Sequence, residues 1–433
     1  MNIMIDKKTK LIVNLSVFII TLNCFFSNLG VYSYRTSPPL LVSSLILTFF
    51  AIFLYKKEQA IGNISKYVFI TFLIIGLSYG IAGVLFFVPT YIMNGYIFAL
   101  QLPLLYICMK FCIIEQLVAV YCKSYVAIST IIILFFMLIA PLNSGQYNGI
   151  FNNPNLTGEF LSCLAICTLY IFEKESLRGI KIANLAIFGI STSLIFFTRS
   201  RTSILACVFL LFAYLIYAIR ERRITGKKLL SLILSIAIAL PTTFFILNDV
   251  TPRMCEVIDI NIDYFGINDS NHSANSFKDA IGDSADRLLK GVNNDSSFSS
   301  GRFEIWQAYI NRISIKPHRP DLVSFEYNGH VLKANSHNSF LQVAYQSGII
   351  SGAAFLFLYI FIGLCALRSL LKDKLNFNDL FAIMTLANSV PYVLLSNTVG
   401  PYTAFSLLSF WIIVIPYYIN KKRRKESTNL KRY

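Results

Sequence analysis

The chain has 433 residues, of which 55% are hydrophobic and only 14% are charged, and its mean hydropathy is +0.61. A soluble protein of this length has a much lower hydropathy, so the composition excludes that class and indicates a polytopic membrane protein. The net charge of +16 requires no nucleic acid, because basic residues that flank membrane spans and contact lipid headgroups account for most of it.

Apolar runs along the chain predict the membrane spans. A helix needs about 20 residues to cross the roughly 30 Å hydrocarbon layer. Twelve runs approach this length and predict an all-α fold: 11–30, 38–55, 67–88, 91–109, 117–141, 156–172, 182–198, 202–219, 229–247, 339–367, 377–396 and 402–419. The first run follows three lysines as a signal peptide would, but no convincing cleavage site ends it, so we expect it to be retained.

The spans divide the chain into three parts. Residues 1–247 hold the first nine spans, residues 248–338 form one large extracytoplasmic loop, and residues 339–433 hold three more spans and a basic tail. With the N-terminus inside, most lysines and arginines fall in cytoplasmic segments, and the long loop has more acidic than basic residues. This asymmetry predicts that both termini are cytoplasmic.

Two arginines occupy the short external turn between the seventh and eighth predicted spans. Arg199 and Arg201 lie on the side of the membrane where basic residues are scarce. Their side chains could extend to lipid phosphates. Alternatively they bind a diphosphate, because the planar guanidinium matches phosphate oxygens and stays charged.

A third arginine opens a helix predicted from the spacing of apolar residues after position 302. Ser300 is expected to cap this helix, with Arg302 in its first turn. A cation there opposes the helix dipole, which indicates either a functional role or a solvated surface arginine.

All four histidines, His272, His318, His330 and His337, lie in the loop 248–338. A histidine is the usual proton carrier near neutral pH. Asn335 or Ser336 is expected to cap the helix that re-enters the membrane, which leaves His337 in its first turn. The positive helix end favours a neutral imidazole able to accept a proton. The alternative is an ordinary residue near a helix cap.

Amide side chains gather in the external turn 149–158, which contains Asn155. Asparagine, proline and glycine are common turn formers. Amides also hydrogen bond to sugars, so glycan binding is the functional alternative.

These segments resemble the O-antigen ligase and O-antigen polymerase superfamily of bacterial membrane glycosyltransferases. The resemblance lies in Arg201 within Ser-Arg-Thr-Ser-Ile-Leu, Arg302 within Ser-Gly-Arg-Phe-Glu-Ile-Trp, and His337 within Ser-His-Asn-Ser-Phe-Leu-Gln. It also includes about twelve spans with a large external loop between spans nine and ten.

The resemblance implies a metal-independent, inverting glycosyl transfer at the outer face of the bacterial cytoplasmic membrane, without a cofactor. The donor would be a glycan on undecaprenyl diphosphate, and the acceptor a glycan or glycolipid of a surface polysaccharide. Arg201 and Arg302, helped by Arg199, would bind the diphosphate, and His337 would orient or deprotonate the acceptor hydroxyl. Asn338 and Asn155 would contact the glycan. Membrane lipids and other polysaccharide-assembly proteins are the expected partners, and nucleic acid is not.

Two alternatives stay open. Ligases of the superfamily often carry a second histidine two places before the matching one, where this chain has Asn335, so ligase and polymerase are not distinguished. A transporter or flippase of lipid-linked oligosaccharides is the other class. Carriers generally need ionisable groups at mid-membrane, but Glu159 and Asp379 fall near span ends, and the two halves show no repeat.

Overall fold

The computed structural model describes residues 7–28, 46, 49, 65–108, 111–142, 146–151, 153–221, 225–258, 301–327, 329–371, 375–396, 399 and 404–419. Within this part of the chain, eight helices are long and apolar enough to cross a membrane. They span Lys66–Phe86, Pro89–Ile107, Gln116–Ile139, Pro154–Lys174, Arg178–Phe197, Arg201–Arg220, Gly226–Ile258 and Ile349–Leu370. Two shorter apolar helical stretches cover Asn14–Phe25 and Phe405–Ile419. The protein is therefore a polytopic membrane protein.

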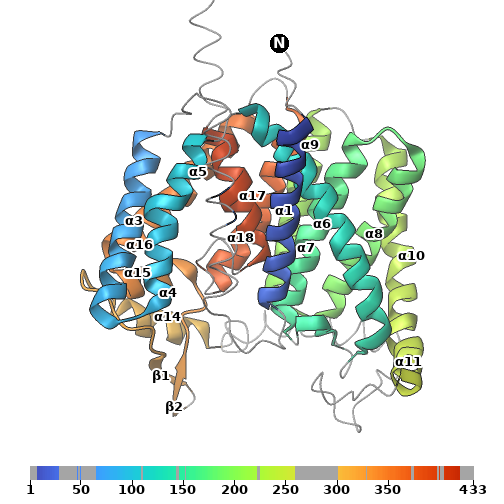
Figure 1. Ribbon diagram of the computed structural model, residues 1–433. Coiled ribbons are helices and arrows are strands. Elements are labelled where there is room, and N and C mark those ends of the chain that lie inside the picture. The colour runs from blue at the N-terminus through green and yellow to red at the C-terminus, as the bar shows by residue number, and fades with distance from the viewer. Residues whose placement is uncertain are drawn as a thin grey trace, which may run out of the picture.

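The individual elements follow the predicted order (Figure 1). They are α1 Lys7–Asn28, α3 Lys66–Phe86, α4 Pro89–Tyr96, η1 Ile97–Gln101, α5 Leu102–Cys108, α6 Phe111–Ile139, η2 Gly149–Phe151, α7 Pro154–Lys174, α8 Arg178–Phe197, α9 Arg201–Arg220, α10 Gly226–Phe245, η3 Ile246–Val250, α11 Thr251–Ile258, α14 Arg302–Ile310, β1 Val323–Tyr327, β2 His330–Ala334, α15 Ser339–Ser347, α16 Ile349–Leu370, α17 Phe377–Leu395, α18 Phe405–Ser409 and η6 Phe410–Val414. The predicted run 38–55 lies almost wholly outside the described residues, and the other eleven runs fall on helices.

Helix α7 is buried along most of its length, and α6, α8, α9 and α17 pack against it. Apolar side chains from these helices and from α1, α16 and α18 form one continuous core. Three π-helical segments interrupt the α-helices of the described part of the chain. Segments η1, η3 and η6 each end two residues before a proline, Pro103, Pro252 and Pro416, which lacks the N–H that an α-helical turn needs.

Three predictions about the elements are wrong. The fold is not all-α, because β1 and β2 form an antiparallel hairpin in which Val323 pairs with Ala334. The predicted run 339–367 is not one helix, because Gly348, at φ +93°, separates α15 from α16. The helix that contains the run 229–247 continues through η3 and α11 to residue 258.

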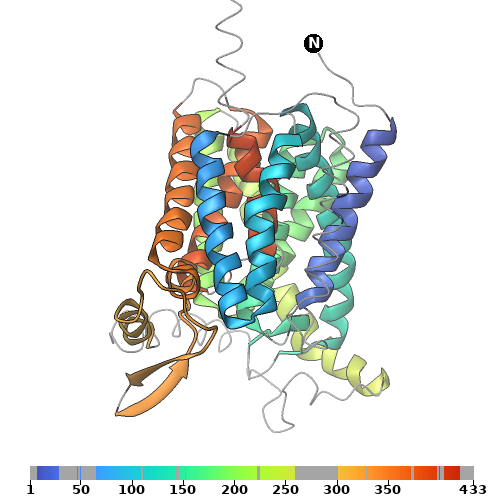
Figure 2. The same ribbon diagram turned by 60° about the vertical axis from the view of Figure 1, so that its left-hand side comes forward.

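The elements between residues 301 and 347 gather at one end of the helical bundle. Figures 1 and 2 show α14 and the β1–β2 hairpin beside the ends of α3, α4 and α16, whereas α1 begins at the opposite end. Ile305 and Tyr309 of α14 pack with Val323 of β1 and Tyr345 of α15 in a small core of their own. The segment that carries Arg302 is thus attached to the bundle mainly through α15.

Candidate functional site

The turn between α8 and α9 positions the first two candidate arginines. Its backbone is held from outside, because the N–H of Tyr147 donates to the carbonyl of Phe197 at 2.8 Å. Gln146 Nε2 donates to the carbonyl of Thr198 at 3.0 Å. Arg199 has a left-handed backbone, with φ at +52°, and Arg201 is the first residue of α9. The backbone directly before Arg199 is therefore fixed.

Ser200 caps α9 and connects it to α7. Its Oγ accepts a hydrogen bond from the N–H of Ser203 at 3.2 Å and donates to Oδ1 of Asn155 at 2.6 Å. A Cβ on Gly158 would lie 2.0 Å from Oγ of Ser203, so only glycine permits this approach of α7 to α9. The structure places Asn155 next to the arginine turn, where its side-chain oxygen holds Ser200.

Helix α14 presents Arg302 at its first position, as predicted, but its cap differs from the prediction. The N-cap is Gly301 rather than Ser300, and its φ of +75° is one that glycine adopts without strain. Gly301 has no side chain with which to cap this helix start. The small core around Tyr309 fixes the orientation of α14, and thereby the place of Arg302.

His337 precedes α15 instead of lying in its first turn, so the predicted caps Asn335 and Ser336 are wrong. Asn338 is the N-cap, and its Oδ1 accepts from the N–H groups of Phe340 and Leu341 at 3.0 and 3.1 Å. The backbone of His337 is left-handed, at φ +46°, which turns the chain just before the cap. Asn338 thus uses its oxygen for the helix, and only its amide N–H groups can serve a ligand.

Electrostatics connect the three principal candidates. Burial lowers the pKa of Arg302, and the charge of nearby Arg201 lowers it further. His337 keeps contact with solvent, but partial burial lowers the pKa of its imidazole, and the charge of Arg302 lowers it further. Within the described residues Arg302 has no acidic partner. Arg302 is thus close enough to Arg201 and to His337 for their charges to interact, although the three residues come from distant segments of the chain.

The other histidines lie elsewhere. The ring of His318 stacks on Tyr345 with 4.5 Å between centroids, and its Nε2 lies 3.4 Å from Oγ of Ser314. His330 is exposed at the start of β2, opposite Tyr327. His272 lies outside the described residues. His337 is a different case, because the charge of Arg302 helps to lower the pKa of its imidazole.

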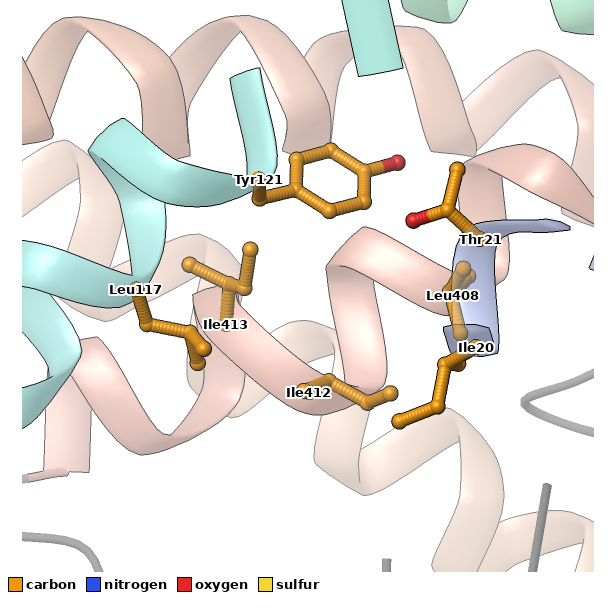
Figure 3. A pocket seen from close by; sticks show the side chains of 7 residues that line it. All are labelled: Ile20, Thr21, Leu117, Tyr121, Leu408, Ile412 and Ile413. Carbon is orange, nitrogen blue, oxygen red and sulfur yellow. The ribbon is translucent and has the colours of Figure 1, made fainter. Parts of the chain in front are cut away.

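An apolar cavity lies away from these residues, between α1, α6 and α18–η6 (Figure 3). It is small, with a volume of about 20 Å³, and is lined by Ile20, Thr21, Leu117, Tyr121, Leu408, Ile412 and Ile413. Hydrocarbon and two hydroxyl groups cannot stabilise a diphosphate, so the cavity is not the anion site. Within the described residues, no group of three or more His, Cys, Asp or Glu side chains could hold a metal ion.

The sequence did not indicate the residues that hold the site together. Ser200, directly before Arg201, is a common N-cap type and could have been found from that pattern. Ser336 was not recognised as a partner of Gln342, whose Oε1 lies 2.8 Å from its Oγ. That contact spans six residues across a turn, for which no simple sequence pattern exists.

Comparison with known proteins finds one family match. Residues 186–356, about two fifths of the chain, match the protein family described as O-antigen ligase. The match contains Arg199, Arg201, Arg302, His337 and Asn338, and Asn155 lies before it. Members of this family are membrane enzymes that ligate or polymerise glycans in surface-polysaccharide assembly. No curated protein matches the chain.

Proposed function

We propose that this membrane protein, which carries an O-antigen ligase domain over residues 186–356, transfers a glycan from undecaprenyl diphosphate to a glycan or glycolipid acceptor. The reaction is an inverting glycosyl transfer that builds O-antigen, capsule or exopolysaccharide. It takes place at the outer face of the bacterial cytoplasmic membrane. The residues proposed to carry it are His337, Arg302 and Arg201.

The observation that carries the proposal is that the charge of Arg201 helps to lower the pKa of Arg302, and the charge of Arg302 helps to lower the pKa of His337. Two guanidinium groups held close together repel each other, and an anion between them removes that repulsion. A diphosphate has oxygens enough for both planar groups. Arg199, two residues before Arg201 in the same turn, adds a third positive charge. The arrangement suits a ligand that gains negative charge as it leaves.

The lowered pKa of His337 suits a general base. At neutral pH its imidazole is unprotonated and accepts the proton of the acceptor hydroxyl. The acceptor oxygen then forms a bond to the anomeric carbon while the bond from that carbon to the diphosphate oxygen breaks. The electron pair of the broken bond goes to the diphosphate, where Arg201 and Arg302 stabilise it. Attack from the opposite face inverts the anomeric centre.

Asn338 and Asn155 have supporting roles in this scheme. The amide N–H groups of Asn338 lie next to His337 in the chain and can donate to a sugar hydroxyl. Asn155 acts chiefly on Ser200, and through that contact it holds Arg201. Glycan binding by Asn155 is restricted to its own N–H groups, because its oxygen accepts from Ser200.

The proposed topology has about twelve spans, with both termini in the cytoplasm and the segment 248–338 outside. The fold is consistent with this sidedness, because α14 and the β1–β2 hairpin lie at one end of the bundle and α1 begins at the other (Figure 1). A lipid-borne diphosphate lies at headgroup level, which is where helix starts such as Arg201 of α9 are found.

Transport is the weaker candidate for a specific reason. Glu159 and Asp379 are buried, at 4% and 1% exposure, and a coupled carrier could use such groups. Each carboxylate already accepts a hydrogen bond from a backbone N–H group at the start of a helix. Glu159 Oε1 accepts from the N–H of Ser406 at 2.9 Å, and Asp379 forms a capping box with Asn376. Both carboxylates thus have a structural role that accounts for their burial.

The function is tested by complementation with single variants. His337→Ala and Arg302→Ala are expected to abolish polymer formation by a deletion strain while the protein still inserts at normal abundance. His330→Ala and Arg312→Ala are matched controls, because both residues are exposed on the same external segment away from the site. Near-normal polymer from either site variant would remove that residue from the mechanism.

The same strain distinguishes ligase from polymerase. Electrophoresis of surface glycans would show single capped repeat units if the protein polymerises. Polymer that stays on undecaprenyl diphosphate would indicate a ligase. If purified protein moved lipid-linked oligosaccharide across liposomes without forming a glycosidic bond, it would be a transporter.

A further inference from the structure

The loop between α14 and β1, residues 311–322, lies against the ends of membrane-spanning helices. The N–H of Ile349, the first residue of α16, donates to the carbonyl of Ser314 at 2.9 Å. Tyr91 of α4 donates its hydroxyl to the carbonyl of His318 at 3.3 Å. Because α16 begins its crossing at Ile349, the middle of this loop is at the level of the membrane boundary.

Large apolar side chains are exposed around this contact. Ile315 in the loop is 74% exposed, Phe87 in the α3–α4 turn is 89% exposed, and Ile349 and Ile350 are 48% and 57% exposed. Exposing such groups to water costs free energy, roughly 25 cal/mol for each Å². Toward the membrane they continue into the exposed apolar residues of α16 and α3, such as Leu356 and Leu85. The surface is thus an extension of the lipid-facing wall.

Basic side chains accompany the apolar ones. Lys316 follows Ile315, and the guanidinium of Arg319 lies 5.9 Å from the ring centre of Phe86. Both cations are exposed. Apolar side chains beside exposed lysine and arginine are typical of segments that lie in the interface and bind anionic headgroups. A water-soluble protein partner is a poorer match for this surface, because it would not cover the adjoining lipid-facing residues.

We propose that Phe87, Ile315, Ile349 and Ile350, with Lys316 and Arg319, form an anchor that inserts into the outer leaflet and binds anionic phospholipid. We refer to these six residues as the interfacial anchor. The anchor continues directly from α14 through Asn311, so it sets the depth of Arg302 relative to the headgroups. This proposal depends on membrane insertion and on the proposed sidedness, but not on the proposed glycosyl transfer.

Site-directed fluorescence in reconstituted vesicles tests the anchor. A bimane probe is attached at Ile315→Cys, and at Val331→Cys as a control, because Val331 is 77% exposed on the hairpin. Labelling of the parent protein supplies the background. Doxyl-labelled phosphatidylcholine is expected to quench the probe at position 315 several-fold more than the probe at 331, and aqueous iodide is expected to show the reverse order.

The charges are tested with vesicles that contain or lack phosphatidylglycerol. Phosphatidylglycerol is expected to increase doxyl quenching at position 315. The double change Lys316→Glu with Arg319→Glu should abolish that increase, whereas Lys333→Glu on the hairpin should not. Efficient iodide quenching at 315 without doxyl quenching would overturn the proposal. Protection from both quenchers would also overturn it, because a protein partner would then cover the surface.

Discussion

The candidate site contains two residues whose backbone is unusual for their type. Arg199 and His337 have left-handed φ values of +52° and +46°, a region that costs a non-glycine residue about 1–2 kcal/mol. Such residues persist where the surroundings fix them. At Arg199 the contacts of Tyr147 and Ser200 do so, and at His337 the Asn338 cap does so. The neighbouring contacts thus offset the cost of the left-handed backbone at both residues.

This strain can be measured at Arg199. Arg199→Gly and Arg199→Ala remove the same charge, but alanine keeps the cost of the left-handed backbone. We expect the glycine variant to be more stable than the alanine variant by about 1 kcal/mol. Thermal unfolding of the two purified variants in one detergent checks this. Equal melting temperatures would show that the turn relaxes when the arginine is lost.

The electrostatic effect of Arg302 on His337 gives a second prediction. Arg302→Gln removes a positive charge that disfavours the imidazolium, so the pKa of His337 should rise. Diethylpyrocarbonate reacts with neutral imidazole, and peptide mass spectrometry reports its reaction at His337 as a function of pH. The midpoint should move to higher pH in Arg302→Gln and stay in place in Arg302→Lys. An unchanged midpoint in both variants would show that the charge of Arg302 does not act on the imidazole of His337.

The pH dependence of the transfer rate follows from the same lowered pKa. Because the folded protein has a lowered pKa at His337, the base stays unprotonated at pH values below the ordinary histidine range near 6.5. The rate of glycan transfer should hold through that range and fall only at lower pH. A fall already at or above the ordinary range would contradict the assignment of His337 as the base.

At the scale of the elements, the contact of α7 with α9 positions the arginine turn. Gly158 permits that contact, since a Cβ would collide with Ser203. Gly158→Ala is therefore expected to lower both the melting temperature and the rate of transfer, with a cost of about 1–3 kcal/mol. Gly363→Ala is the control, because a Cβ there meets nothing within 4 Å. That change should be neutral or stabilising.

Element boundaries were predicted best where composition alone decides them. Long apolar runs predicted eleven helical segments, because length and hydropathy are local properties. The break at Gly348 was missed, since the apolar run continues through it. It depends on close packing, with a Cβ at Gly348 meeting the carbonyl of Ile315 at 2.4 Å. The hairpin was missed although Gly329 and the alternation Val323, Phe325, Tyr327 indicated it.

At the scale of the whole molecule, the convergence of the three site residues was predicted only through the family resemblance, because no local sequence pattern indicates it. The sequence supplied the residue types, and the resemblance supplied Arg201, Arg302 and His337. Their meeting depends on how the core of α14, β1 and α15 docks on the membrane helices, which is a tertiary property. The helix N-caps were predicted less well. Gly301 and Asn338 are the N-caps of α14 and α15, whereas the sequence pattern favoured Ser300 and Asn335 at least as much.

Sidedness is a property of the whole molecule and has its own prediction. A cysteine at Lys333 of the hairpin should react with a membrane-impermeant maleimide in intact spheroplasts. A cysteine at Lys181, at the other end of α8 from the arginine turn, should react only after permeabilisation. Both positions are exposed or half-buried, so access depends on the membrane alone. The reverse pattern would invert the proposed topology.

Binding of a polyprenyl diphosphate to the purified protein in nanodiscs tests the central claim most directly. Arg201→Gln and Arg302→Gln should each weaken binding about tenfold or more, as expected for loss of a charge-assisted hydrogen bond. The double variant should lose less than the product of the two factors, because both arginines bind one ligand. His337→Gln should bind normally and fail to transfer. Wild-type affinity in either arginine variant, or strictly multiplicative losses, would contradict a shared diphosphate site.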